Sequence, residues 1–341
     1  MRIGLLTGGG DCPGLNAVIR GVTRRAIDTY NYDVLGIKNG WQGLVLGEVE
    51  PLSDYAVSGI LHRGGTVLGT SRTNPLAKRD DFLKLRDNIK KYSIDALIAV
   101  GGEDTLSVAL KLHREGIKVV GVPKTIDNDI MGTDFTFGFN TAVSVVTDAI
   151  DRLHTTAESH HRVMVVEVMG RESGWIAVMS GIAGGADAIL IPEVPFDYED
   201  LCAKLKKRHR QKSFSIVVVA EGAAPGEGEP IVQSDRKDAF GHVILGGVGR
   251  IVADEIEVRT GIETRLTVLG HIQRGGSPTA YDRILATRFG VRAVDAVHKG
   301  DFGKMVALRS EKIITIKLEE AVLKNKKVDM ELYEIAEMFF G

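Results

Sequence analysis

Short apolar runs recur along the chain, and a polar or glycine-rich segment follows most of them. Runs of this length are typical of buried parallel strands, and they predict strands at 3–7, 34–37, 96–100, 118–122, 163–168, 188–191, 215–220 and 267–269. Apolar positions at helical spacing predict helices at 15–30, 82–89, 143–153 and 246–257, with another from 284 onward. Because strands and helices alternate throughout, we expect an α/β protein of doubly wound lobes.

Charged residues are densest in the stretch 96–129, which predicts a strand, a glycine turn, a helix and a second strand that breaks at Pro123. Ligands of open α/β sheets bind beyond the carboxyl ends of such strands. Five charged side chains lie in the two loops there: Glu103, Asp104, Lys124, Asp127 and Asp129. Mutual repulsion among the carboxylates calls for a metal or a cationic partner. The alternative is that they are ordinary turn and helix-start residues.

Two glycine-rich segments, GGGDCPG at 8–14 and RGGTVLGTSR at 63–72, are candidate phosphate sites. A strand-to-helix glycine turn presents backbone N–H groups and the positive end of the helix dipole. The first turn is neither GxGxxG nor a P-loop, so alone it is weak. Trp41 either covers a ligand or packs its loop, and the spacing of His154, His160 and His161 matches no zinc motif.

Composition narrows the class of protein. The 341 residues suggest two or three domains' worth of core, and a net charge of −2 gives no reason to expect nucleic acid or a membrane surface as partner. The two cysteines, Cys12 and Cys202, have no metal or redox spacing. Apolar runs fall short of the roughly 18 residues of a membrane span, and the start lacks a signal peptide. We therefore expect a cytoplasmic location.

Several motifs together resemble the phosphofructokinases, which phosphorylate the 1-hydroxyl of fructose 6-phosphate. They are LTGGGDCPGLNAVIRG, RGGTVLGTSR, VGGEDTL, PKTIDND, HHRVMVVEVMGRESG, PEVPF and LGHIQRGGSPTAYDRILA, in the family's order over residues 3 to 290. The resemblance implies two Rossmann-like lobes with the active site in the cleft between them. The lobes would be a donor and Mg²⁺ lobe at 1–138, with part of the C-terminal region packing back on it, and a fructose 6-phosphate lobe at 139–305, followed by a C-terminal strand/helix segment at 306–341.

The resemblance also implies roles for individual residues. Asp127 would be the general base, Thr125 and Asp129 would orient the reacting groups, and Glu103 would hold Mg²⁺. Donor-binding residues would be Gly9, Gly10, Arg72, Gly102, Asp104 and Lys124. The sugar phosphate would be bound by Thr125, Asp127, Arg162, Met169, Gly170, Arg171, Glu221, Arg265, His271 and Arg274. Arg171 would in addition stabilise the moving phosphoryl group. Arg162 and Arg265 would reach the neighbouring subunit's site in a homodimer or homotetramer.

Two positions indicate the phosphoryl donor. In ATP-using members the positions of Asp104 and Lys124 are typically glycine. Here both positions are charged, as they are in members that resemble pyrophosphate-dependent enzymes. A carboxylate about 4 Å from the α-phosphate of ATP would repel it by about 4 kcal/mol at an effective dielectric near 20. We therefore predict inorganic pyrophosphate as donor. The alternatives are that Asp104 is a helix N-cap and Lys124 a solvated loop lysine.

Regulation and other functions follow from the same comparison of residues. Arg20 and Arg24 match effector-binding positions of regulated bacterial members, but Asp54 and His154 replace arginines, so we expect a non-allosteric enzyme. An ATP-dependent phosphofructokinase and a non-catalytic sugar-phosphate sensor remain alternatives. A dehydrogenase is disfavoured because no GxGxxG follows the first strand. The charged segment 324–327 is predicted to be a solvated surface of a helical tail, whose role stays open.

Overall fold

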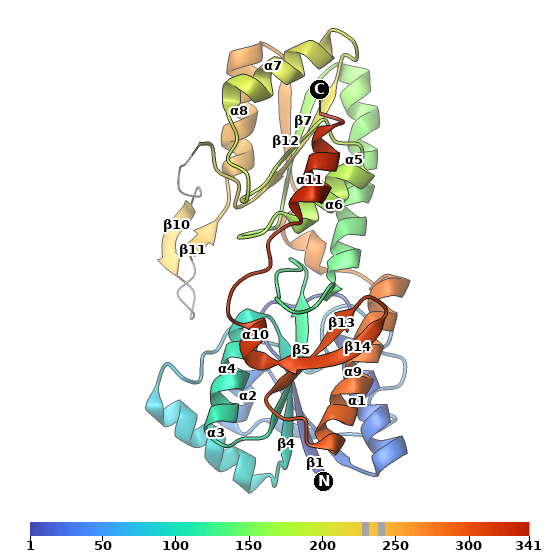
Figure 1. Ribbon diagram of the computed structural model, residues 1–341, viewed down its shortest axis with the longest axis vertical. Helices are drawn as coiled ribbons and strands as arrows, with labels where there is room; N and C mark the ends of the chain where they lie inside the picture. The colour runs from blue at the N-terminus through green and yellow to red at the C-terminus, as the bar shows by residue number, and fades with distance from the viewer. Residues whose placement is uncertain (227–231, 238–242, 341) are drawn as a thin grey trace.

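Two lobes stacked end to end make up the molecule (Figure 1). The computed structural model describes residues 1–226, 232–237 and 243–340. Each lobe contains a sheet of largely parallel strands with helices on both faces. The α/β class and the pair of Rossmann-like lobes expected from the sequence are confirmed.

The first lobe contains an eight-stranded sheet whose middle is parallel. In spatial order its strands are β14 (Lys312–Lys317), β13 (Lys304–Arg309), β5 (Val119–Thr125), β4 (Ala96–Gly101), β1 (Arg2–Thr7), β2 (Asp33–Ile37) and β3 (Val49–Leu52), and the short β6 (Phe137–Gly138) pairs with β5 off this path. The edge strands β3 and β14 are antiparallel to their neighbours. Every residue of β4 and β5 is buried, as expected for central parallel strands covered on both faces.

Helices from distant parts of the chain cover this sheet. One face packs against α1 (Leu15–Tyr30) and α9 (Ala280–Lys299), and the other against α2 (Trp41–Leu46), α3 (Arg79–Lys91), α4 (Glu103–Arg114) and α10 (Leu318–Ala321). The two helices of the first face approach closely through glycines. A Cβ on Gly21 would lie 2.9 Å from the Thr287 carbonyl oxygen, and one on Gly290 would lie 2.7 Å from that of Val18. The chain thus returns to the first lobe after building the second.

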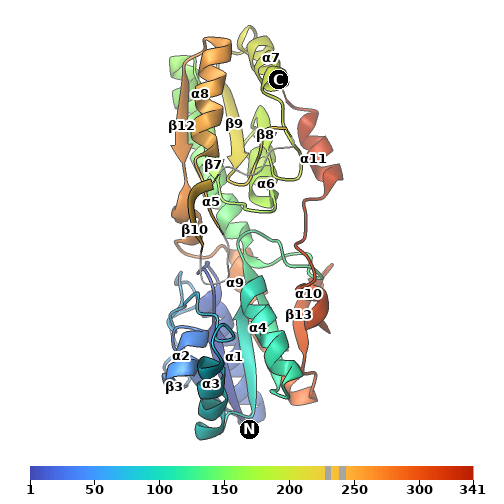
Figure 2. The same ribbon diagram turned by 90° about the vertical axis from the view of Figure 1, so that its left-hand side faces the viewer.

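The second lobe contains a four-stranded parallel sheet in the order β12 (Thr264–Val268), β7 (Val163–Val168), β9 (Ser215–Ala220) and β8 (Ala188–Leu190). The helices α5 (Phe139–His160) and α6 (Trp175–Ala183) cover one face, while α7 (Tyr198–His209) and α8 (Val248–Thr260) cover the other. A two-stranded sheet of β10 (Val232–Lys237) and β11 (Val243–Leu245) projects from it, and the 3-10 helix η1 (Gly270–Arg274) follows β12. The helix α11 (Met330–Glu337) packs on α6, as Figure 2 shows.

Three sequence-based expectations require correction. The strand predicted to end before Pro123 continues to Thr125. On one side of this strand, the pairing with β13 ends at Gly121 and the pairing with β6 begins at Lys124. Because Pro123 lies between these two pairings, its missing N–H removes no hydrogen bond on that side. The tail predicted to be helical at 319–340 contains two short helices, α10 and α11, and the segment 322–329 between them is not helical. Segment 324–327 is only partly solvated, because Asn325 and Lys326 are half-buried.

Trp41 and two of the clustered histidines make contacts within the fold. Trp41 is buried in the core against the second face of the first sheet, so of its two predicted roles it has the packing one. His154 lies 2.6 Å from the Gly184 carbonyl oxygen, and His161 lies 2.9 Å from the Ser213 hydroxyl. Across the part of the chain that the structure describes, no helix is long and apolar enough to cross a bilayer.

Candidate functional site

The carboxyl ends of the strands of the first lobe meet the loops of the second at the junction between them. Among the hydrogen bonds that cross it, Arg274 donates from Nη1 to the Asp11 carbonyl oxygen at 3.2 Å, and Ser173 donates from its hydroxyl to the Asp127 carbonyl oxygen at 3.2 Å. Arg274 comes from η1 and Ser173 from the loop between β7 and α6. The junction between the lobes is therefore built from loops at the strand ends of both lobes.

The loop that carries Asp127 leaves β5 in a fixed geometry. The Asp127 amide donates to the Thr125 hydroxyl at 3.0 Å, and the Thr136 hydroxyl donates to the Thr125 carbonyl oxygen at 2.8 Å. Asn128 adopts a left-handed conformation with φ of 52°, and its buried side chain accepts the Thr136 amide at 3.1 Å. Asparagine tolerates this conformation better than most residues. The Asp127 carboxylate is thus presented on a rigid turn.

Two opposing effects act on the pKa of Asp127, the burial of its carboxylate and the charges of nearby cations. Burial raises the pKa of Asp127, and Arg274, Lys124 and Arg171 oppose this rise. Asp127 Oδ1 is buried and accepts no hydrogen bond from any residue within the described ranges. A buried carboxylate with an open acceptor and three nearby cations is a strong candidate for a proton acceptor.

Two further carboxyl groups respond to the same environment. Burial, followed by the charge of Asp127, raises the pKa of Asp129 to about 7. Burial and the charge of Asp127 also raise the pKa of Glu221 to about 7. Because both shifts include repulsion from Asp127, the three carboxyl groups share one electrostatic field, although Glu221 comes from the second lobe.

Lys124 connects β5 to the glycine turn after β1. It is the second-last residue of the strand, only 3 % exposed, and its Nζ donates to the Gly10 carbonyl oxygen. Burial lowers its pKa. The alternative of a solvated loop lysine is therefore wrong, because the ammonium lies inside the junction.

The glycine turn itself is tightly enclosed. A Cβ on Gly10 would lie 2.5 Å from Arg274 Nη1, and a Cβ on Gly9, whose φ is +78°, would lie 3.5 Å from Lys124 Nζ. The backbone at Gly9 and Gly10 thus lies close to both cations. A phosphate held here would meet backbone N–H groups and a positive field together.

At the start of α4, two acidic residues occupy the first turn. Gly102 is the N-cap, and Glu103 and Asp104, both half-buried, are the first two residues of the helix. Asp104 is therefore not the helix N-cap, and that alternative is wrong. The N-terminus of a helix is ordinarily a ready site for phosphate. Two carboxylates in the first turn counteract that positive potential.

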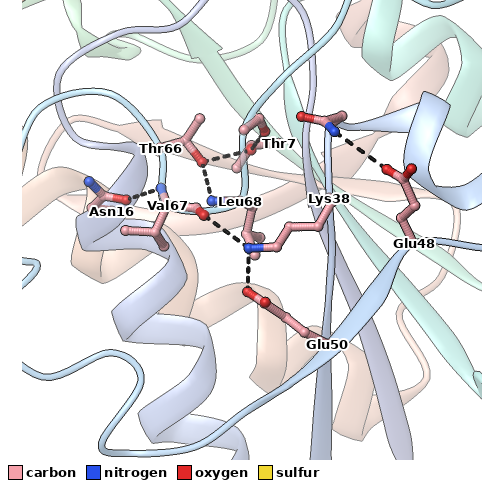
Figure 3. Close-up of polar contacts among 10 residues, drawn as sticks. Thr7, Asn16, Lys38, Glu48, Glu50, Thr66, Val67 and Leu68 are labelled. Carbon is pink, nitrogen blue, oxygen red and sulfur yellow. Dashed lines mark hydrogen bonds and ion pairs between the residues drawn. The ribbon is translucent and has the colours of Figure 1, made fainter.

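The second glycine-rich segment is held against β1 and α1 (Figure 3). Thr66 Oγ1 lies 2.9 Å from Thr7 Oγ1, Asn16 accepts the Val67 amide at 2.8 Å, and Lys38 donates to the Val67 carbonyl oxygen at 3.3 Å. A few residues on, the Ser71 carbonyl oxygen accepts the Gly9 amide at 3.1 Å. These contacts place the exposed Arg72 beside the glycine turn.

The second lobe supplies the remaining candidate residues through two loops. Met169 donates from its amide to the Gln273 side chain at 3.2 Å, and Gly170 adopts φ of +137°, with its carbonyl oxygen accepting the Gly222 amide at 3.1 Å. These bonds hold together the loop of Arg171, the end of β9 at Glu221, and η1. His271 on η1 is exposed.

Arg162 and Arg265 do not join this site. Arg162 immediately precedes β7, and Arg265 pairs in register with Met164 on the same strand. Five residues of strand separate Met164 from Met169, which is about 16 Å. Arg162 instead pairs with Glu263 at 2.9 Å, and Arg265 bonds to the same carboxylate.

Sequence reasoning missed several residues that organise the site. Gln273 is fully buried and ties η1 to Met169, while Ser173 ties the second lobe to Asp127. Lys326 reaches the Asp127 loop from the C-terminal segment, with its amide 2.7 Å from the Asp129 carbonyl oxygen. The GHIQRGG and MGRESG motifs contained the first two residues, but nothing in the sequence placed Lys326 here.

Carboxylates from two loops could hold a divalent cation together with a phosphate ligand. Among the described residues, no group of three or more His, Cys, Asp or Glu side chains is placed to form a metal cage. Mg²⁺ commonly binds through one or two carboxylates plus substrate phosphates. The charge of Glu103 contributes to the raised pKa of Asp129, so a carboxylate suited to this role lies near the Asp127 loop.

Comparison with known proteins gives a consistent result. Residues 2–297 match the protein family described as Phosphofructokinase. The chain is 58 % identical, over its full length and that of the relative, to the pyrophosphate–fructose 6-phosphate 1-phosphotransferase of Streptomyces coelicolor. It is 54 % identical to the ATP-dependent 6-phosphofructokinase of Corynebacterium efficiens, covering 100 % of this chain and 99 % of the relative. The crystal structure of Pichia pastoris phosphofructokinase in the T-state is similar with a TM-score of 0.84 at 35 % identity, over 99 % of this chain and 36 % of that longer one.

Proposed function

Because the chain belongs to the phosphofructokinase family, we propose that it transfers a phosphoryl group from inorganic pyrophosphate to the 1-hydroxyl of fructose 6-phosphate. The products are fructose 1,6-bisphosphate and phosphate, and the reaction runs reversibly in glycolysis and gluconeogenesis. The observation that carries this proposal is the buried carboxylate of Asp127, with an open acceptor oxygen and with Lys124, Arg171 and Arg274 around it.

Asp127 takes the proton from the sugar 1-hydroxyl as that oxygen attacks phosphorus. A general base must be held within reach of the proton and ionised at the working pH. The Thr125 and Asn128 contacts hold the carboxylate in place, and the three cations oppose the rise in its pKa. Thr125 and Asp129 orient the reacting groups. Arg171 offsets charge on the transferred phosphoryl group, which such reactions require.

The donor lies between the glycine turn and the start of α4, along the first lobe at 1–138. Gly9, Gly10, Arg72 and Gly102 line it with backbone and one basic side chain. The ammonium of Lys124 faces the pyrophosphate leaving group. The carboxylate of Asp104, in the first turn of α4, occupies and repels the region that the α-phosphate of a nucleotide would enter. Pyrophosphate is short enough to avoid that region.

Glu103 is the residue of this chain that would hold Mg²⁺, with substrate phosphates completing the coordination. When bound, the metal supplies positive charge that neutralises phosphate oxygens during transfer. Nearby Asp127 and Asp129 contribute the negative field that favours a cation at this place.

Fructose 6-phosphate binds on the second lobe, at the loops that follow β7, β9 and β12. Its contacts are Met169, Gly170, Arg171, Glu221, His271 and Arg274 from this chain. Arg162 and Arg265 lie at the far end of β7 and β12, so they would serve the site of a neighbouring subunit. This part of the proposal implies a homodimer or homotetramer.

Regulation by anionic nucleotides is not expected. Arg24, a basic effector-binding position in the resemblance, pairs within the chain with Asp28 at 2.9 Å and with Asp54 at 3.5 Å. His154 bonds to a backbone carbonyl oxygen instead of pointing a cation at a ligand. We propose a non-allosteric enzyme that works in the cytoplasm.

The decisive experiment measures fructose 1,6-bisphosphate formation from fructose 6-phosphate and Mg²⁺, with pyrophosphate and ATP tested separately. Wild-type protein should use pyrophosphate and scarcely ATP, and Asp104→Gly should gain ATP turnover. The matched control is Asp80→Gly, an exposed acid in the first turn of α3, which should leave donor choice unchanged.

Each other outcome has a distinct meaning. A wild type that prefers ATP would contradict the donor assignment and agree with the ATP-dependent relatives. Turnover with neither donor, together with fructose 6-phosphate binding, would favour a sugar-phosphate sensor.

A further inference from the structure

The segment between α10 and α11 runs along the outside of the junction between the two lobes (Figures 1 and 2). It belongs to neither of the two sheets. Its residues 325–328, which we term the strap, make polar contacts with a loop of each lobe. Because the strap lies beyond residue 297, it is outside the segment that matches the family.

Contacts of the strap with the first lobe all fall on the loop that follows β5. Asn325 forms an isolated antiparallel bridge with Ile130, and the Lys326 amide donates to the Asp129 carbonyl oxygen at 2.7 Å. The Lys326 ammonium donates to the carbonyl oxygens of Thr133 at 3.1 Å and Asp134 at 2.6 Å. The strap therefore holds both ends of residues 129–134, which begin two residues after Asp127.

Contacts with the second lobe fall on the loop that carries Arg171, on the start of α6 and on Glu193 after β8. Asn325 donates to the Glu172 carboxylate at 2.5 Å, and Lys327 donates to the Glu172 carbonyl oxygen. Trp175 donates from its indole to the Lys326 carbonyl oxygen at 3.3 Å. The Val328 amide and the Gly174 amide both donate to the carboxylate of Glu193, at 3.1 Å.

Lys326 joins the two sets of contacts in one side chain. While its ammonium bonds to carbonyl oxygens of the first lobe, the same nitrogen lies 4.9 Å from the centre of the Trp175 ring of the second, within the range of a cation–π interaction. Burial lowers the pKa of Lys326 to about 8, opposed by Asp134 and Asp129, so this lysine is enclosed among the groups it connects.

We propose that Lys326 is a positioning residue for phosphoryl transfer, which fixes the Asp127 loop of the first lobe relative to the Arg171 loop of the second. This inference rests on the proposed function. The base and the phosphoryl-binding arginine come from different lobes, so their relative placement depends on contacts that span the junction. A displacement near 1 Å costs about 10²-fold in rate in such reactions.

The test compares Lys326→Met, Lys326→Arg and Trp175→Leu with Lys324→Met, a control at an exposed lysine of the same segment. Lys326→Met keeps most of the aliphatic stem but removes both carbonyl hydrogen bonds and the charge. We expect kcat with pyrophosphate to fall 10- to 100-fold, while KM for each substrate changes less than about threefold. Lys326→Arg should recover much of the loss, and Lys324→Met should equal the wild type.

The Trp175→Leu variant separates a positioning role from an effect on the stability of the fold alone. Trp175→Leu removes the ring on the other lobe, so it should lower kcat in the same way, and its effect should not multiply with that of Lys326→Met. Melting temperature and circular dichroism report the folded fraction, to which each kcat is normalised. If Lys326→Met does not fold, Trp175→Leu and Lys326→Arg carry the comparison.

Two results would overturn the inference. Folded Lys326→Met or Trp175→Leu with wild-type kcat would show that the strap only stabilises the fold, while leaving the proposed function intact. Wild-type protein without turnover on either donor would remove the proposed function and the positioning role together.

Discussion

Replacing Asp129 with asparagine should make the protein more stable at alkaline pH, although it alters the candidate active site. Burial and the charge of Asp127 raise the pKa of Asp129 to about 7, whereas an aspartate in an unfolded chain titrates near 3.9. The folded state therefore binds this proton more tightly than the unfolded state. Stability that depends on protonated Asp129 is fully present below about pH 4 and is lost as the pH rises through about 7.

The magnitude follows from the size of the shift. Three pKa units correspond to about 4 kcal/mol, of which about 3 kcal/mol is lost between pH 5 and pH 8. The asparagine variant carries no charge at this position, and its side-chain amide oxygen can still accept a hydrogen bond. The variant is therefore expected to gain stability relative to wild type as the pH rises. The difference in the free energy of unfolding, variant minus wild type, should be about 3 kcal/mol larger at pH 8 than at pH 5.

Urea unfolding at pH 5 and pH 8, at one fixed protein concentration, measures this difference. Asp151→Asn, at an exposed position of α5, is the control and should show the same pH dependence as wild type. If Asp129→Asn and wild type lose stability equally between the two pH values, then Asp129 is not a buried acid with a raised pKa.

Three further changes test the candidate site. Asp127→Asn removes the proton acceptor, so kcat should fall about 10²- to 10⁴-fold with fructose 6-phosphate binding preserved in calorimetry; wild-type kcat would rule out Asp127 as base. Lys124→Met removes a buried ammonium that bonds to Gly10, and kcat with pyrophosphate should drop about 10²-fold in steady-state kinetics; an unchanged kcat would contradict its role at the leaving group. Gly10→Ala places a Cβ 2.5 Å from Arg274 Nη1, so KM for fructose 6-phosphate should rise roughly tenfold through loss of a charge-assisted contact; an unchanged KM would mean that Arg274 does not hold the sugar phosphate.

Alternation of short apolar runs and glycine turns was sufficient to predict the α/β class, four of the eight strands of the first sheet and all four of the second. The strands at 163–168 and 215–220 match β7 and β9 because both are continuous apolar runs covered on both faces. The apolar pattern did not predict the edge hairpin of β13 and β14, and only the family resemblance implied strand structure at 306–341. β14 begins and ends with an exposed lysine, and its four middle residues are only half-buried. Its pairing partners lie on β13, a strand that joins β5 from a distant part of the chain.

The candidate site divides in a similar way between what sequence spacing predicts and what it does not. Loops that end parallel strands of one sheet converge by geometry, so Glu103, Lys124 and Asp127 could be grouped from sequence alone. Lys124 was expected to be a loop residue, and only the continuation of β5 through Pro123 shows why it is buried. Lys326 could not be found, because its contacts depend on the path of the chain after the last helix of the first lobe.

The return of the chain to its first lobe has a consequence for synthesis. Strands β4 and β5 emerge from the ribosome long before α9 and β13, which cover and extend them. Until β13 pairs at Val120 and Gly121, one side of β5 is an unpaired edge with apolar surface, the kind of surface that aggregates. The second lobe draws its whole sheet from residues 163–268 and can close earlier. We expect nascent chains halted near residue 300 to resist protease in the second lobe and not the first. The active site, which needs both lobes, is then among the last parts of the molecule to form.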